Sequence, residues 1–120
     1  MITEDNCCSI VPYFQVEEGK MDEFKRICDR FMERTSQEPQ CLYYGFSFNG
    51  NIAHCREGYE NAQGVIAHLE NVDDLLTEAL AISDIIRLEI HGNQAQINQL
   101  KKPLAQIDVE YFVLEYGFRR

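Results

Sequence analysis

Apolar and polar residues alternate along the chain with two different spacings, one typical of strands and one typical of helices. Residues 7–16 are rich in Cys, Ile, Val, Tyr and Phe, which favours a strand, and Pro12 favours an edge or bulged position for it. Gly19 breaks this run. Apolar residues then recur at helical spacing with charged residues between them, which predicts a helix over about 20–35 that ends before Pro39.

A β-hairpin is predicted next. Residues 41–48 are dense in aromatic and β-favouring side chains, residues 52–59 have the pattern of a returning strand, and Asn49-Gly50 between them tolerates the positive φ of a tight turn. A two-residue loop would sort the side chains by parity, whereas a loop with an odd number of residues would exchange the two faces. One face would carry Leu42, Tyr44, Phe46, Phe48, Ala53, Cys55, Glu57 and Tyr59, and the other Tyr43, Gly45, Ser47, Ile52, His54 and Arg56.

The second half of the chain predicts a helix, a strand, a short helix and a last strand. Asn61 is a suitable N-cap for an apolar stripe that runs to Leu80, and Asn71 has the pattern of a second cap, so this helix is expected to bend or restart there. The strand over 85–91 would place Ile86, Leu88 and Ile90 on one side and Arg87, Glu89 and His91 on the other. A short helix over 94–100 and a strand over 111–118 complete the chain.

The order of these elements predicts an α+β fold. It reads β-α-β-β-α-β, the ferredoxin-like arrangement, with a C-terminal helix and an extra strand added. Both main helices would cover one face of a four-stranded antiparallel sheet. Both faces of the hairpin carry large apolar groups, such as Tyr43 and Ile52 on one face and Phe46 and Phe48 on the other. We therefore expect a second subunit to bury the uncovered face in a symmetric homodimer.

Charge and cysteine content exclude several classes of function. The chain has 20 acidic and 11 basic residues and a net charge of −9, which disfavours nucleic acids and membranes as partners. The acidic start of the chain lacks the pattern of a signal peptide, and no apolar run approaches the ~20 residues that span a bilayer. A cytoplasmic location is expected, in which the five cysteines would be free thiols.

One stretch of the chain resembles a known family. Residues 57–69 begin with Glu-Gly-Tyr at a strand end and carry Ala-His-Leu in the following helix, which is similar to the antibiotic biosynthesis monooxygenase (ABM) domains of the dimeric α+β barrel superfamily. The helix start at 19–24 and the strand at 85–90 fall in the matching order. The resemblance covers about residues 8–91 of a single domain, 1–120, and leaves 92–120 as a C-terminal extension.

The resemblance implies a homodimer of ferredoxin-like subunits, each with a pocket between sheet and helices. Some family members oxygenate phenols or quinols with molecular oxygen and without a metal, flavin or haem, so no cofactor is expected. Such a protein must supply a base, hydrogen-bond donors for an oxyanion and an apolar cavity. The haem-degrading branch of the superfamily uses a Trp, which this chain lacks.

Five residues are candidates for a site. His68, at the position of the family's helix histidine, would act as base, or would be a structural histidine bonded to backbone. Tyr44 and Tyr59 would line the pocket with their hydroxyls, or would be core aromatics. His54 and Arg56 would contact an anionic or phenolic group of the substrate, or would form polar contacts within a subunit interface.

Two functions are compatible with this sequence. The first is a cofactor-independent monooxygenase that acts on a small phenolic or quinol-like aromatic compound. The second is a non-catalytic dimeric module that binds a ligand or a partner through the same pocket. A metal site is not expected, because no HxH, HExxH or CxxC spacing is present.

Overall fold

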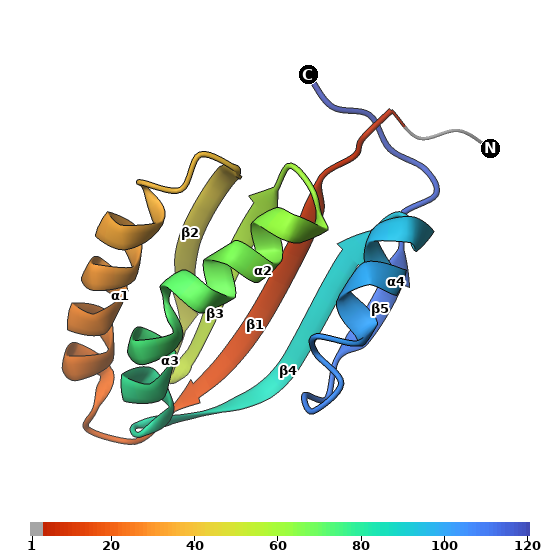
Figure 1. Cartoon of the computed structure of the whole chain (residues 1–120). Helices are drawn as coiled ribbons and strands as arrows, with labels where there is room; N and C mark the ends of the chain where they lie inside the picture. Colours follow the sequence, from red (N-terminus) through yellow and green to blue (C-terminus); the bar gives the residue numbers. More distant parts are fainter. Residues whose placement is uncertain (1–3) are drawn as a thin grey trace.

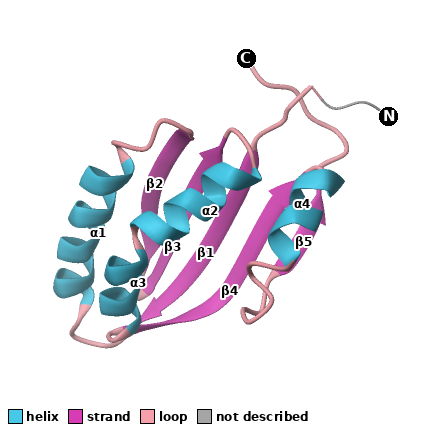
Figure 2. Cartoon of the chain, viewed as in Figure 1, coloured by secondary structure: helices cyan, strands magenta, loops and turns pink. Residues whose placement is uncertain are grey.

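Nine helices and strands make up the part of the chain that the computed structural model describes, residues 4–120. They follow one another as β1 (Cys8–Val16), α1 (Met21–Thr35), β2 (Cys41–Asn49), β3 (Ile52–Tyr59), α2 (Ala62–Asn71), α3 (Asp73–Leu80), β4 (Ser83–Gly92), α4 (Gln94–Lys101) and β5 (Glu110–Val113). All four helices lie on one side of a single sheet (Figure 1; Figure 2). The opposite face of the sheet carries no helix (Figure 1).

The sheet has the order β2-β3-β1-β4-β5. The pairs formed by the first four strands are antiparallel, and β5 adds to the edge of β4 in a parallel direction. This arrangement confirms the ferredoxin-like α+β fold with its added helix and strand. The last strand is shorter than the predicted 111–118, because Val113 pairs with Gly92, the last residue of β4, and no sheet partner follows.

The core lies between the sheet and the helices in two clusters. One cluster joins the end of β1 and the start of β3 to α1 and α3, with Phe14, Phe24, Phe31, Val72 and Leu75 among its buried members. The other joins the opposite ends of the same strands to α2 and α4, with Ile10, Tyr59, Val65, Ile90 and Leu100 among its members. Burial of these side chains is the main contribution to the packing of the helices on the sheet. Each large apolar side chain contributes roughly 1.5–3 kcal/mol of stabilising free energy.

The second helix restarts as predicted, but not by the predicted cap. The side chain of Asn61 accepts a hydrogen bond from the backbone N–H of Gly64 (2.9 Å) and caps α2, as expected. The N-cap of α3 is Val72, which has no side chain able to cap. Asn71 was expected to fill that role, and this expectation is wrong, because its side-chain amide instead donates to Glu38 (2.8 Å).

The register of the hairpin confirms a two-residue loop. Asn49 pairs with Ile52, and Gly50 between them has a φ of 58°. Tyr44, Phe46 and Phe48 of β2 therefore share the helix-covered face with Ala53, Cys55, Glu57 and Tyr59 of β3, as predicted. Leu42 is an exception, because an irregularity between Cys41 and Tyr43 shifts the pairing there.

A second irregularity changes the prediction for β4. The pairing with β1 shifts between Tyr13, opposite Arg87, and Phe14, opposite Ile85. Ile86 falls in this bulge and is exposed, whereas Ile85 lines the cavity described below. The predicted placement of Ile86 beside Leu88 and Ile90 is therefore wrong.

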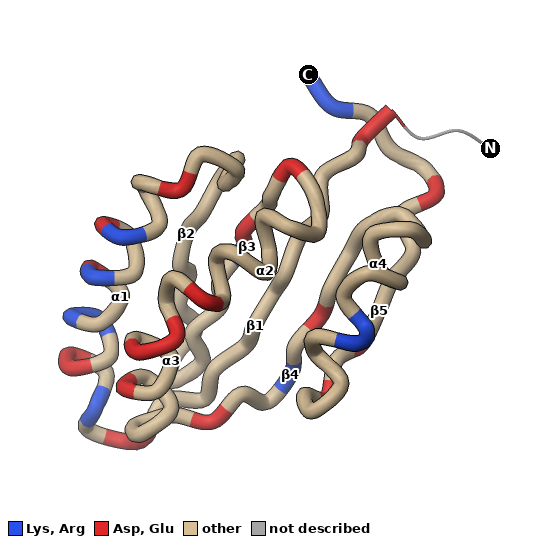
Figure 3. The backbone as a smooth tube through the Cα atoms, in the orientation of Figure 1, with Lys and Arg blue, Asp and Glu red and all other residues tan. Residues whose placement is uncertain are grey.

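Many of the charged residues belong to α1 and α3 (Figure 3). Arg30 and Arg34 of α1 form ion pairs with Glu78 (2.6 Å) and Asp74 of α3, which ties these two helices together at the surface. Within residues 4–120, no helix combines the length and the apolar character that crossing a membrane requires.

Candidate functional site

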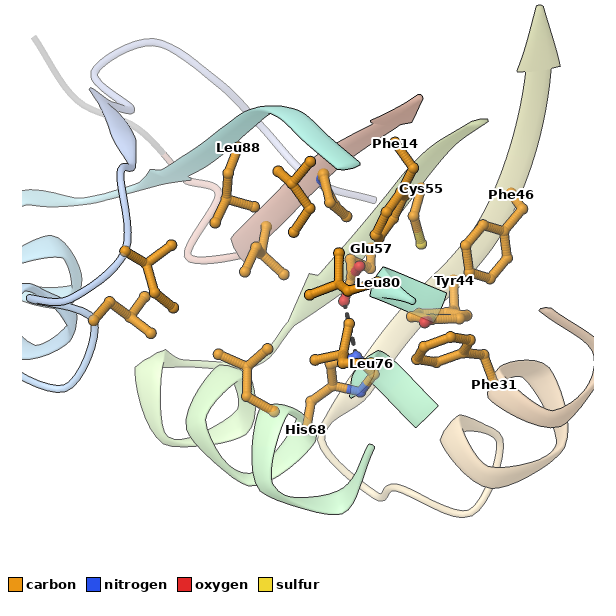
Figure 4. Close-up of a pocket in the computed structure, with 16 residues that line it drawn as sticks. Phe14, Phe31, Tyr44, Phe46, Cys55, Glu57, His68, Leu76, Leu80 and Leu88 are labelled. Atoms are coloured by element: carbon orange, nitrogen blue, oxygen red, sulfur yellow. Dashed lines mark ion pairs between the residues drawn. The ribbon is translucent and has the colours of Figure 1, made fainter. Parts of the chain in front are cut away.

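A narrow cavity of about 140 Å³ lies between the sheet and the helices. Its walls are apolar except for a few polar side chains that reach it from β2, β3 and α2 (Figure 4). The residues that line it are Ile10, Pro12, Phe14, Phe31, Tyr44, Phe46, Cys55, Glu57, His68, Leu69, Leu76, Leu80, Ile85, Leu88, Leu104 and Ile107. A largely apolar cavity with a small number of convergent polar groups is the usual form of a small-molecule site.

The polar groups are organised around His68. Its Nε2 lies 3.2 Å from Oε1 of Glu57, which points toward it across the cavity (Figure 4), and its Nδ1 lies 2.9 Å from Oε2 of Glu38. Glu57 and His68 are both buried, and the Glu38 carboxylate lies nearer the surface. One imidazole therefore bridges an inner carboxyl group at the cavity and an outer carboxyl group.

Further hydrogen bonds hold both carboxyl groups in place. The hydroxyl of Tyr59 donates to Oε1 of Glu57 (2.5 Å), and the side-chain amide of Asn71 donates to Oε2 of Glu38 (2.8 Å). Asn71 is the last residue of α2, and Glu38 belongs to the connection between α1 and β2. The cap at Asn61 sets where α2 begins, and His68 follows on the face that packs on the sheet. The site is thus built from β3, α2 and the α1–β2 connection.

Burial governs the ionisation of Glu57. Its pKa is raised by removal of the carboxyl group from water, while the nearby His68 and the hydrogen bonds from Tyr59 and Cys55 act in the opposite direction. Two arrangements of one proton fit the short distance to His68. In one, a neutral carboxylic acid donates to a neutral imidazole, and in the other, an imidazolium donates to a carboxylate.

The other polar groups at the cavity are neutral donors. Burial raises the pKa of the Tyr44 hydroxyl and of the Cys55 thiol, and the nearby Glu57 raises both further. The rings of Tyr44 and His68 lie 5.3 Å apart. A hydroxyl held neutral next to an acid–base group can donate a hydrogen bond to an oxygen of a bound molecule.

The structure brings three of the five candidate residues to one region. His68 and Tyr44 line the cavity, and Tyr59 lies beside it with its hydroxyl on Glu57 rather than in the lining. His54 and Arg56 lie on the uncovered face of the sheet. They pack there against Tyr13 and Tyr43, with centroid distances of 4.9 Å and 5.7 Å. Any ligand that these two residues contact would bind on that face.

Sequence reasoning missed the two carboxyl groups. The parity of the hairpin already placed Glu57 among Tyr44, Phe46 and Tyr59, and an acidic residue on an otherwise apolar strand face was the signal that could have identified it. Glu38 gave no comparable signal, since its contact with His68 joins residues that are far apart in the chain. Within residues 4–120, no three His, Cys, Asp or Glu side chains come together as metal ligands would.

Comparison with solved structures includes a match over nearly the whole chain. No family model matches the chain, and no curated protein does. Among solved structures, MupZ from Pseudomonas fluorescens is 45% identical to it, with a TM-score of 0.92 over 97% of this chain and 96% of that chain. A relative at this identity and coverage shares its family with the chain.

More distant structures share the fold. SnoaB from Streptomyces nogalater, a cofactor-independent oxygenase, is 14% identical, with a TM-score of 0.64 over 72% of this chain and 91% of that chain. An antibiotic biosynthesis monooxygenase is 16% identical, with a TM-score of 0.63 over 69% of this chain and 94% of that chain. The chain therefore belongs to the same family as MupZ, and it shares the ferredoxin-like α+β fold of the antibiotic biosynthesis monooxygenase structures.

Proposed function

We propose that this protein is a cofactor-independent acid–base enzyme that moves a proton to or from an oxygen atom of a small molecule bound in the apolar cavity. The observation that supports this most directly is the buried contact between Glu57 and His68 at the cavity wall (3.2 Å). A buried carboxyl group beside an imidazole can act both as acid and as base near neutral pH. The fold shared with a cofactor-independent oxygenase supports monooxygenation as the specific reaction.

In that reaction the substrate is a phenolic or quinol-like compound. The Glu57 carboxylate accepts the phenolic proton. Before this transfer, the imidazolium of His68, which is paired with Glu38, compensates the negative charge of Glu57. The Tyr44 hydroxyl donates to the phenolate oxygen as its charge develops. The electron-rich anion reduces molecular oxygen and is itself oxidised, so that a phenol and O₂ give a quinone and water. The apolar walls exclude bulk water from the reactive intermediate.

A second reaction class is favoured by the raised pKa of Glu57. A carboxyl group that stays protonated in an apolar cavity can donate to a carbonyl, hydroxyl or ether oxygen, and His68 with Glu38 can return the proton. Such chemistry consumes no oxygen. It uses the same residues as monooxygenation. The two reactions therefore differ only in whether molecular oxygen is a co-substrate.

The test is oxygen uptake over a panel of quinols and phenols, together with product analysis under air and under nitrogen. Glu57→Gln and His68→Ala are compared with Glu60→Gln, an exposed carboxylate three residues from Glu57. Oxygen-dependent product that is lost in the first two variants supports the monooxygenase. Product formed equally under nitrogen supports the second class. Substrate binding without any turnover would overturn both and support the non-catalytic ligand-binding module.

We also propose a homodimer that pairs through the uncovered sheet face. Aromatic side chains lie on this face, including Tyr13, Tyr43 and Phe112, beside the charged Arg56 and Arg87. Exposed apolar groups gathered on one face are typical of protein–protein contact surfaces. Its pairing with an identical face in a second copy would leave the cavity accessible from the helix side.

A further inference from the structure

The two ends of the cavity differ in chemistry. Aromatic side chains of α1, β1 and β2 surround one end, whereas the other end is lined by leucine and isoleucine. In the close-up, Leu88 lies on one side of Glu57, and Phe31 and Phe46 lie on the other (Figure 4). The aliphatic end consists of Ile10, Leu69, Leu88 and Leu104, which pack in one cluster, and of Ile107, which follows Leu104 in the chain. This end has no polar side chain that could satisfy a ring hydroxyl of a bound molecule.

The cavity opens to solvent between α3 and the connection from α4 to β5, beside the aliphatic end. Leu80, Ile85 and Ile107 line the cavity, yet their exposed fractions are 44%, 38% and 47%. They come from the end of α3, the start of β4 and the connection from α4 to β5. Leu88 and Leu104, further inside, are buried. A molecule that enters here therefore crosses an apolar rim before it reaches Glu57.

The connection between α4 and β5 forms part of this end as an ordered wall. The backbone N–H of Leu104 donates to the carbonyl of Leu100 (3.0 Å), and that of Ile107 donates to the carbonyl of Leu104 (3.0 Å). Leu104 thereby stays packed in the same cluster as Leu88 and Leu100. Residues beyond β4, which we expected to lie outside the shared core of the family, thus contribute directly to the cavity.

We propose that the aliphatic end is a subsite for an alkyl chain, and that Leu104 and Ile107 determine which chain fits. The substrate would be a molecule whose oxygen-bearing group lies at Glu57 and whose chain extends past Leu88 toward the opening. Only the placement of the reacting group rests on the proposed function. A cavity of about 140 Å³ is close to the size that holds one benzene molecule in an engineered apolar cavity, so a longer chain would project through the rim.

The first experiment measures binding of 1-alkanols from butanol to decanol by calorimetry, with phenol and cyclohexanol as compact references. Each added methylene is expected to increase affinity about fourfold, until the chain fills the subsite and the increase stops. Hexanol should bind more tightly than phenol and cyclohexanol, which have the same number of carbon atoms. Tighter binding of the two rings, or an affinity independent of chain length, would overturn the proposal.

Single-tryptophan variants locate the chain, since the natural sequence has no Trp. In Ile107→Trp, octanol should change the indole emission and bind about tenfold more weakly than to the natural protein, because the larger side chain narrows the opening. Ile86→Trp is the matched control, since Ile86 is similarly exposed but does not line the cavity, and its emission should not respond. A response at Ile86 with none at Ile107 would place the ligand elsewhere and contradict the subsite.

Glu57→Gln separates this inference from the proposed function. In this variant every alkanol should change in affinity by a similar factor, so that the roughly fourfold gain per methylene persists, because the chain contacts are unchanged, while turnover should be lost. Chain-dependent binding with turnover unaffected in Glu57→Gln would refute the acid–base role and retain the subsite. Lost turnover without chain-dependent binding would refute the subsite and retain the acid–base role.

Discussion

Nε2 of His68 lies 3.2 Å from Oε1 of Glu57, and both side chains are buried. This close polar contact joins the second helix to the sheet, in addition to the apolar packing between them. The outer carboxylate of Glu38 lies on the other ring nitrogen (2.9 Å), so the imidazole is held in one orientation. The two groups are within the distance over which acid–base catalysis transfers protons.

Glu57→Gln is expected to change how stability depends on pH. Because the folded-state pKa of Glu57 is raised, the folded protein binds more protons than the unfolded chain from about pH 4.5 upward. The free energy of unfolding of the natural protein should therefore fall as pH rises through this window. Gln cannot ionise, so the variant lacks this loss, and its stability relative to the natural protein should grow by about 1.4 kcal/mol per pH unit within the window.

Urea unfolding at several values between pH 4.5 and pH 8 checks this prediction, with Glu60→Gln as the control. Glu60 is exposed and close in sequence, so its replacement should leave the pH dependence of the natural protein unchanged. A constant difference between Glu57→Gln and the natural protein over this range would contradict a raised pKa at Glu57.

His68 and Glu38 are expected to stabilise the fold as a coupled pair. His68→Ala leaves the Glu57 carboxyl group buried without its imidazole, which should cost about 3–5 kcal/mol. A double-mutant cycle of His68→Ala and Glu38→Ala should give a coupling of about 1–3 kcal/mol, because each replacement already removes the shared contact. The exposed pair Arg30 and Glu78 provides the comparison and should couple more weakly. Additive effects at His68 and Glu38 would show that their contact does not contribute.

Gly58 is expected to tolerate alanine poorly. A Cβ atom there would lie 2.7 Å from Sγ of Cys7 and closer still to the ring of Tyr43, which packs over this glycine on the uncovered face. Tyr43 would have to move, at a cost of roughly 1–3 kcal/mol in thermal or urea unfolding. Gly45 is the matched control, since no atom lies within 4 Å of a Cβ built there. An equal effect of Gly58→Ala and Gly45→Ala would show that the close approach of Tyr43 is unimportant.

The assembly can be tested on the uncovered face. Sedimentation equilibrium at micromolar concentration should give a dimer, and Ile52→Glu, which places a charge on that face, should shift the population to monomer. Met32→Glu introduces the same charge on α1, away from the uncovered face, and should leave the dimer intact. A stable monomer of 14.0 kDa for the natural protein would refute the proposed dimer.

Local signals predicted the elements well because they depend on neighbouring residues. The cap at Asn61 and the two-residue hairpin loop were both recognisable, and the loop placed Tyr44, Glu57 and Tyr59 on one face of the hairpin. The alternation of side chains between the two faces of a strand predicted the wrong face for Leu42 and Ile86. A bulge changes which face a residue occupies, and its position depends on the pairing with another strand.

The sequence by itself therefore determined the order of the elements, the ferredoxin-like arrangement and which hairpin side chains share a face, since these follow from periodicity and turn chemistry. Only the tertiary structure decided the site. Glu38, Glu57 and His68 come from three separate segments, and Leu104 and Ile107 reach the cavity from a fourth. Which distant side chains meet, and which carboxyl group loses its water, is determined by the packing of whole elements, for which no local pattern exists.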